Sequence, residues 1–260
     1  MKKEKIIFFG NGPLAEAALS VFEKHFEVVF RAKDKVDLET VKKLKLSHPE
    51  IHGILASFGV MIKADLLEIF EPEGILNIHP SLLPLYRGAS PIETAILDGN
   101  TEFGVSIMKL AAGMDAGPIY YQTTLADLPP VKSEIYQALA ETGAKWIVKN
   151  LDNLPQPTPQ DDSKATFTQK ISKQMGEINP ETETAEEILR KIIAFQGFPK
   201  VRYTFYGQKC IILEAHIVDK GDAATITIPC ADGRFVAIDR LQPEGRKAMD
   251  VKAFLNGYKK

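Results

Sequence analysis

The sequence predicts an α/β protein with a parallel-sheet domain followed by a smaller, β-rich domain. Three observations predict it. Short apolar runs alternate with helical patterns over about the first 150 residues. A proline-rich polar stretch then interrupts the pattern, and short runs of alternating polarity follow it. Strands that alternate with helices form parallel sheets with right-handed crossovers, so we expect a Rossmann-like first domain. The later runs predict a barrel-like sheet of OB type.

The first domain opens with the apolar run 6–9, a Gly-Asn-Gly-Pro turn and a helical pattern over 14–25. This is a strand–loop–helix opening, and the same alternation continues along the chain. Further strands are expected at 26–31, 53–57, 74–78, 104–110 and 119–125, and further helices at 38–45, 63–70, 91–98 and 133–151.

The stretch 154–163 is rich in proline and polar residues, which is typical of an interdomain linker. We therefore divide the chain into a first domain (1–154), a linker (155–170) and a second domain (171–260). In the second domain a helix is expected at 185–195, with Thr182 or Thr184 near its N-cap. Its strands are expected at 201–206, 209–217, 224–228 and 235–241.

The composition is that of a soluble globular protein: 45% of the 260 residues are hydrophobic and 25% are charged. A net charge of −2 argues against a surface that binds nucleic acid over its whole extent, but permits a local basic face. Residues 171–260 hold 14 Lys and Arg against 12 Asp and Glu, so the second domain is the more basic part.

The pattern of cysteines, histidines and apolar runs predicts a cytoplasmic protein without a metal. Cys210 and Cys230 lack the spacing of a zinc site or a redox motif, so we expect free thiols in a reducing compartment. Nothing in the sequence pairs the histidines as metal ligands. The first apolar run is too short for a signal-peptide core or a membrane span, so no membrane association is expected.

Three polar residues between 74 and 118 suggest a catalytic site. Asn77 and His79 close an apolar strand, and residues two apart on a strand point to the same face. Asp115 lies in the glycine-bracketed turn Gly113–Gly117. An amide beside an imidazole, joined by a carboxylate, can stabilise an oxyanion and move a proton. Taken singly, His79 could equally be structural, and Asp115 could simply stabilise its own turn.

Two other kinds of site fit the sequence less well. The Gly10-Asn11-Gly12 turn resembles half of a dinucleotide fingerprint, but no acidic residue closes the second strand, so a tight turn is the simpler interpretation. Ser81 could serve as a nucleophile with His79 and Asp115. It lacks the G-x-S-x-G turn that exposes such a serine, so a serine hydrolase is disfavoured.

The ordered motifs resemble the folate-dependent formyltransferases. They are Asn77-Ile78-His79, then Ser81-Leu82-Leu83-Pro84, then Arg87-Gly88-Ala89-Ser90-Pro91-Ile92, then Gly113-Met114-Asp115-Ala116-Gly117. The form of the second and third motifs is most similar to the methionyl-tRNA formyltransferase branch. So is the stretch Leu241-Gln242-Pro243-Glu244-Gly245-Arg246-Lys247-Ala248-Met249, and the resemblance spans nearly the whole chain.

The resemblance implies transfer of a formyl group from 10-formyltetrahydrofolate, a co-substrate, to the α-amino group of methionyl initiator tRNA in translation initiation. It implies Asn77, His79 and Asp115 as the catalytic residues of a 1–154 formyltransferase domain. It also implies tetrahydrofolate binding by Ser81, Leu82, Leu83 and Pro84 and by Phe58, Gly59, Val60, Met61 and Ile62. The second domain is then expected to contact tRNA, and the protein to be a monomer.

Two alternatives stay open. The segment 31–37 after the second expected strand is short, whereas this branch carries a longer basic loop there, and a short loop favours a sugar-nucleotide N-formyltransferase with the same donor. A folate- or RNA-binding protein without activity is the other, although the chain keeps all three polar residues.

Overall fold

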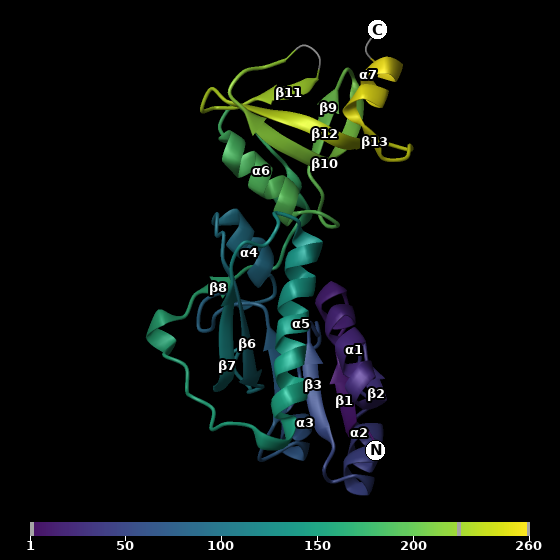
Figure 1. Ribbon diagram of the computed structural model, residues 1–260, viewed down its shortest axis with the longest axis vertical. Coiled ribbons are helices and arrows are strands. Elements are labelled where there is room, and N and C mark those ends of the chain that lie inside the picture. The colour runs from purple at the N-terminus through teal and green to yellow at the C-terminus, as the bar shows by residue number, and fades with distance from the viewer. Residues whose placement is uncertain (1–2, 223–224, 259–260) are drawn as a thin grey trace. The chain divides into compact units, whose positions relative to one another are not determined.

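The computed structural model describes residues 3–222 and 225–258 and divides into two compact units (Figure 1). One unit contains Met1–Ile92 and Thr101–Gln169, and the other contains Glu93–Asn100 and Lys170–Lys260. The residues between 155 and 169 therefore group with the first unit.

The first unit is built on a sheet with strand order β2-β1-β3-β4-β6-β7. The four parallel strands confirm the predicted Rossmann-like sheet, and β6 and β7 then extend it in antiparallel pairing. The strands are β1 (Lys5–Phe9), β2 (Glu27–Ala32), β3 (His52–Ala56), β4 (Ile75–His79), β6 (Phe103–Lys109) and β7 (Ile119–Leu125). β4 lies inside the sheet, between β3 and β6, and every residue of it is buried.

Helices cover both faces of this sheet. Figure 1 shows α5 beside α1, and α5 approaches the sheet so closely that a Cβ added at Gly143 would lie 2.8 Å from Ile78 Cγ2. The other face carries a hydrophobic cluster in which Val41 of α2 and Leu66 of α3 join Phe9, Leu55 and Ile75 of the strands. The helices are α1 (Pro13–His25), α2 (Leu38–Ser47), α3 (Ala64–Ile69) and α5 (Lys132–Asn150), followed by the 3-10 turn η1 (Leu151–Asn153).

The proline-rich segment after η1 is held against the first unit. Thr158 and Ile119 exchange two backbone hydrogen bonds of 2.8 Å. Beyond the 3-10 turn η2 (Asp162–Lys164), the short strand β8 (Phe167–Thr168) pairs in parallel with β5 (Arg87–Gly88). Neither strand was predicted, because two-residue strands carry no periodicity.

The second unit is an antiparallel sheet with strand order β11-β12-β10-β9, in which β13 pairs with β12. The β-rich, barrel-like prediction is confirmed, and register shifts in β10 are of the kind that bend a strand. The strands are β9 (Arg202–Phe205), β10 (Gln208–Val218), β11 (Ile226–Pro229), β12 (Phe235–Pro243) and β13 (Met249–Asp250). Residue 224 of the predicted strand 224–228 lies outside the described residues.

Helix α6 (Ala185–Ala194) packs on this sheet, and Thr184 accepts from the Glu187 backbone N–H as its N-cap, as predicted. Arg190 of α6 donates to the Leu97 carbonyl of α4 (Pro91–Leu97), which explains why residues 93–100 group with this unit. Two further elements were not predicted: the turn η3 (Lys173–Gly176) and the C-terminal helix α7 (Val251–Tyr258), whose Phe254 is fully buried.

Candidate active site

The C-terminal end of β4 carries the two strand residues of the predicted site. Asn77 pairs with Leu55 on one side and Met108 on the other, and His79 pairs with Ser106. Both share the parity of Ile75, so they lie on the sheet face that bears the hydrophobic cluster of α2 and α3. Each is only 4% exposed, so polar groups at this position must be satisfied by the protein or by a ligand.

The His79 ring lies between a backbone carbonyl and the Asp115 carboxylate. Nε2 is 3.1 Å from the Tyr86 oxygen, and Nδ1 is 3.7 Å from Asp115 Oδ2. Because a carbonyl oxygen only accepts, Nε2 carries the proton of this hydrogen bond. In the neutral ring Nδ1 is then unprotonated and faces the carboxylate. The structure thus brings His79 and Asp115 together across 36 residues of chain.

Asp115 is held in an unusual backbone conformation. Its φ is +46°, in the left-handed region, and its Oδ2 accepts a 2.8 Å hydrogen bond from the Gly88 backbone N–H. A Cβ added at Gly117 would lie only 1.8 Å from the Lys109 carbonyl oxygen, so glycine is required there for the loop to close. Gly117, one of the two glycines that bracket Asp115 in the sequence, therefore allows the loop to hold the carboxylate in this position.

Burial dominates the electrostatics of His79. Removal of the ring from water lowers its pKa below the usual value, and this outweighs the Asp115 carboxylate and the Tyr86 hydrogen bond, which both raise it. The ring is therefore neutral at pH 7. Asp115 acts against burial, because its negative charge favours the cationic form of the ring, but burial has the larger effect.

Asn77 has an uncommitted side chain. Within the part of the chain that the structure describes, its amide makes no hydrogen bond, although the residue is 4% exposed. Among the described residues, Arg31 Nε is the one fully buried side-chain nitrogen or oxygen without a partner, so the amide atoms of Asn77 remain accessible to solvent. Such a group is suited to a ligand that brings its own hydrogen-bonding atom.

The 81–84 loop, predicted to bind folate, is fixed mainly by bonds within the protein. The Ser81 hydroxyl donates to the Leu85 carbonyl at 2.7 Å, and Ser106 Oγ donates to the Ser81 carbonyl at 2.6 Å. Leu83 is 3% exposed, and Leu82 packs where a side chain at Gly104 would stand. The side chains of Ser81, Leu82 and Leu83 are thus engaged in packing, and Pro84 is half-buried.

The 58–62 segment, also predicted to bind folate, follows β3 and combines packed and exposed apolar residues. Phe58 and Ile62 pack against the cluster that contains Ile75, on the face shared by Asn77. Gly59 and Val60 between them are exposed, and Met61 is 88% exposed. A flexible thioether exposed beside a hydrophobic cluster is typical of a surface that receives an apolar ring.

Several groups at the site were missed by sequence reasoning. The Tyr86 carbonyl and the Gly88 N–H are backbone groups, which no residue type reveals. Gln160 donates to the carbonyls of Asp115 and Gly117, both at 2.7 Å, from a segment that was interpreted only as a linker. A polar residue among prolines is the sole signal that the sequence offered for it.

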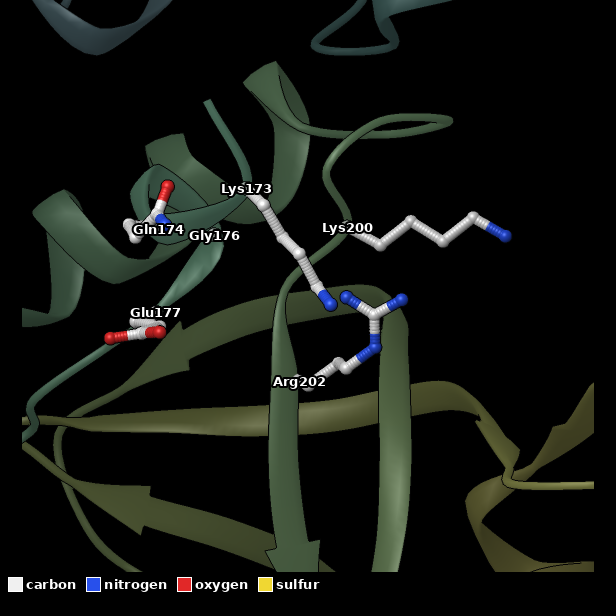
Figure 2. A pocket seen from close by; sticks show the side chains of 6 residues that line it. All are labelled: Lys173, Gln174, Gly176, Glu177, Lys200 and Arg202. Carbon is white, nitrogen blue, oxygen red and sulfur yellow. The ribbon is translucent and has the colours of Figure 1, made fainter. Parts of the chain in front are cut away.

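The second unit carries a basic hollow of about 320 Å³, lined by Lys173, Gln174, Gly176, Glu177, Lys200 and Arg202. Figure 2 shows the Lys173 and Arg202 side chains extending into the hollow, while Lys200 extends to one side and Glu177 points away. Among the described residues neither lysine forms an ion pair, and Phe198 nearby in the chain is 58% exposed. Three cationic side chains around one hollow attract an anion.

The described residues contain neither a metal-binding cluster nor a membrane-spanning helix. Within 3–222 and 225–258, no three His, Cys, Asp or Glu side chains lie close enough together to hold a metal ion. No helix of that range is long and apolar enough to cross a membrane.

Several solved structures share this fold. A methionyl-tRNA formyltransferase from Clostridium thermocellum aligns with a TM-score of 0.62 at 20% identity, over 92% of this chain and 98% of that one. HypX from Aquifex aeolicus in complex with tetrahydrofolic acid aligns with a TM-score of 0.71 at 18% identity, over 98% of this chain and 47% of that one. WlaRD, a sugar 3N-formyl transferase, gives 0.66 at 20% identity, over 95% and 100%.

Sequence comparison identifies nearer relatives. The family model for formyl transferase matches residues 8–151, and that for its C-terminal domain matches 170–259. A methionyl-tRNA formyltransferase of Dehalococcoides mccartyi is 36% identical over 222 residues, 79% of this chain and 70% of that protein. One of Neisseria meningitidis is 34% identical over 259 residues, 94% and 82%. The chain therefore belongs to the formyl transferase family, in its methionyl-tRNA formyltransferase branch.

Proposed function

We propose that this formyltransferase moves a formyl group from 10-formyltetrahydrofolate to the α-amino group of methionyl initiator tRNA, with Asn77, His79 and Asp115 as catalytic residues. One observation carries the assignment of the residues. The unpartnered amide of Asn77 lies on the same buried strand end as an imidazole whose open nitrogen is 3.7 Å from a carboxylate.

The residues present suit a formylated folate. A bound donor supplies a formyl carbon that amines attack. Asn77 offers an uncommitted N–H donor for the negative charge that develops on the formyl oxygen, and loss of one such donor typically costs about a hundredfold or more in rate. The exposed Val60 and Met61, beside a hydrophobic cluster, offer apolar surface to a ring system.

His79 and Asp115 handle the proton. An α-amino group has a pKa of about 7.7–8.0, so a useful fraction of the acceptor is uncharged at neutral pH. The neutral His79 ring accepts the proton released by the attacking amine at Nδ1 and passes it to the departing nitrogen. Asp115 stabilises the imidazolium while the proton resides there, because its Oδ2 lies on the Nδ1 side of the ring.

We assign the acceptor tRNA to the second domain, residues 171–260, and catalysis to residues 1–154. The basic hollow offers an arginine and two lysines that form no ion pair with any described residue, and these side chains bind phosphate in RNA backbones. The exposed Phe198 offers a face for stacking. Residues 155–170 join the two domains.

One observation favours the alternative acceptor. Only five residues, 33–37, connect β2 to α2, and a short connection leaves less surface for an RNA acceptor stem than for a sugar nucleotide. The match of residues 170–259 to the formyl transferase C-terminal domain supports the tRNA acceptor instead.

Turnover with defined acceptors tests the proposal. The enzyme is incubated with 10-formyltetrahydrofolate and either methionyl initiator tRNA, the same tRNA without methionine, or an amino-sugar nucleotide. We expect formyl-methionine only from the charged tRNA. Formylation of the sugar nucleotide with the tRNA untouched would establish the alternative, and no transfer to any acceptor would exclude both.

A further inference from the structure

Gln160 makes contacts that a linker residue does not need. Its side-chain N–H groups donate to the carbonyls of Asp115 and Gly117, both at 2.7 Å. Its side-chain oxygen accepts from Arg87 twice, from Nε at 3.0 Å and from Nη2 at 2.7 Å. Every hydrogen-bonding direction of one amide is thus used between the Asp115 loop and β5.

Arg87, the partner of the Gln160 side-chain oxygen, lies next to the residue that binds the Asp115 carboxylate. Arg87 is 4% exposed, and the next residue, Gly88, provides the backbone N–H that binds Asp115 Oδ2. Gln160 therefore links the two elements that hold Asp115: the loop that carries the residue and the strand that binds its side chain. Asp162 adds a 2.6 Å ion pair to Arg87 from the same segment.

The Asp115 loop needs such support. A residue other than glycine at a φ of +46° is strained by about 1–3 kcal/mol and keeps this conformation only where surrounding contacts enforce it. Within the loop itself one backbone hydrogen bond is present, from Ala116 to Gly113 at a long 3.4 Å. The two bonds from Gln160 are shorter and fix the carbonyls of Asp115 and Gly117 directly.

We infer that Gln160 is a positioning residue for formyl transfer: it holds the Asp115 loop so that Asp115 Oδ2 faces His79 Nδ1. This inference rests on the proposed function of that site. Gln160 contacts neither His79 nor the reacting atoms in the proposed chemistry; it acts through the backbone of Asp115. A segment that follows the last helix of the catalytic domain thereby becomes part of its active site.

Two substitutions separate positioning from general stability. Gln160→Glu keeps the acceptor for Arg87 but replaces the donating nitrogen with an oxygen that faces two carbonyl oxygens, so the loop must move. Gln160→Met has a similar length, removes all four bonds and adds no charge. Gln156→Glu is the matched control, because Gln156 lies in the same proline-rich segment, is exposed, and has no hydrogen bond among the described residues.

The first measurement is steady-state turnover. A displacement of about 1 Å in a catalytic group can cost about a hundredfold in rate. We expect both Gln160 variants to lower kcat by roughly ten- to a hundredfold, with KM for the folate donor within about threefold of wild type, and Gln156→Glu to match wild type. A Gln160→Glu kcat within twofold of wild type would overturn the inference.

The second measurement needs no substrate. NMR titration of the His79 ring follows the distance to Asp115, because the carboxylate raises the pKa of His79. If the loop moves away, His79 titrates at lower pH in both Gln160 variants than in wild type, while thermal unfolding shows that they are folded. An unchanged titration in folded variants would refute positioning. If wild type transfers no formyl group, the proposed function fails, yet this titration still tests what Gln160 does.

Discussion

The candidate active site and the basic hollow both bring polar side chains together, but they differ in how far those side chains are removed from water. At the active site, Asn77 and His79 are 4% exposed, and the His79 ring is held by the Tyr86 carbonyl on one side and faces the Asp115 carboxylate on the other. In the hollow, Lys173 and Arg202 are exposed, and water and salt share their charge. One site is fixed by the fold; the other is defined by net charge.

The difference determines how each region responds to change. A buried, preorganised group in a low dielectric acts strongly and alone, so loss of one side chain is severe. Exposed cations act together through a screened field, so loss of one is mild and depends on salt. Substitutions in the two regions should therefore differ in size and in salt dependence.

The largest effect is expected for the catalytic pair. His79→Ala and Asp115→Asn remove the proposed proton acceptor and the carboxylate proposed to stabilise its cation, so we expect kcat to fall by about a hundredfold or more. Donor binding should change little, because neither side chain is assigned to the folate ring. His25→Ala is the matched control, since His25 is exposed and has no partner among the described residues. Turnover near that of wild type in either variant would remove that residue from the mechanism.

A second large effect is expected from the backbone of the same loop. Gly117→Ala places a methyl group where the Lys109 carbonyl oxygen stands, and overpacking of this kind costs about 1–3 kcal/mol. Urea unfolding followed through Trp146 reports on the first unit, because this single tryptophan stacks on Tyr121 of β7. Gly59→Ala is the control, with nothing within 4 Å of the added methyl. Equal midpoints for the two variants would contradict the geometry of the loop.

These two experiments probe what the sequence did and did not predict. Asn77, His79 and Asp115 could be named because strand parity and a glycine bracket are local signals. Most of the sheet could also be predicted, because buried strands leave apolar runs. The Tyr86 carbonyl, the Gly88 N–H and Gln160 could not be predicted, since tertiary contacts recruit them and nothing in their own neighbourhoods marks them.

The charge of the resting site was also beyond the sequence. The proximity of Asp115 suggests a cationic His79, but the net shift depends on how completely the ring is removed from water, and burial lowers its pKa. Helix α7 was missed for a different reason: it has only eight residues, too few for a helical period to be told from a short apolar run, although its Phe254 is fully buried.

An intermediate effect is expected from pH. The pKa of His79 is lowered on folding, so the unfolded chain binds the proton more readily and stability falls as pH drops below about 6.5. One such group contributes at most about 1.4 kcal/mol per pH unit. His52, whose pKa burial also lowers, contributes in the same direction, so wild type must be compared with His79→Gln.

The measurement is the Trp146-reported unfolding free energy at pH 7.5, 6.5 and 5.5. Wild type should lose more stability than His79→Gln across this range. In wild type, the unfolded chain gains a proton at His79 that the buried ring of the folded protein binds less readily, whereas glutamine does not titrate. A difference between the two proteins that stays constant from pH 7.5 to 5.5 would show that the ring is not held neutral.

The smallest effect is expected in the basic hollow. If Lys173 contacts one phosphate, its loss reduces the slope of log affinity against log salt by about 0.9. The same relation gives about fivefold weaker tRNA binding at 0.15 M salt, with the difference vanishing towards 1 M. Lys173→Ala is compared with Lys252→Ala, an exposed lysine on α7 away from the hollow, by filter binding from 0.05 to about 0.5 M salt. A loss of affinity that does not depend on salt would mean that Lys173 acts like a buried group, and the contrast between the two regions would then be wrong. An unchanged slope would instead place the RNA backbone elsewhere on the molecule.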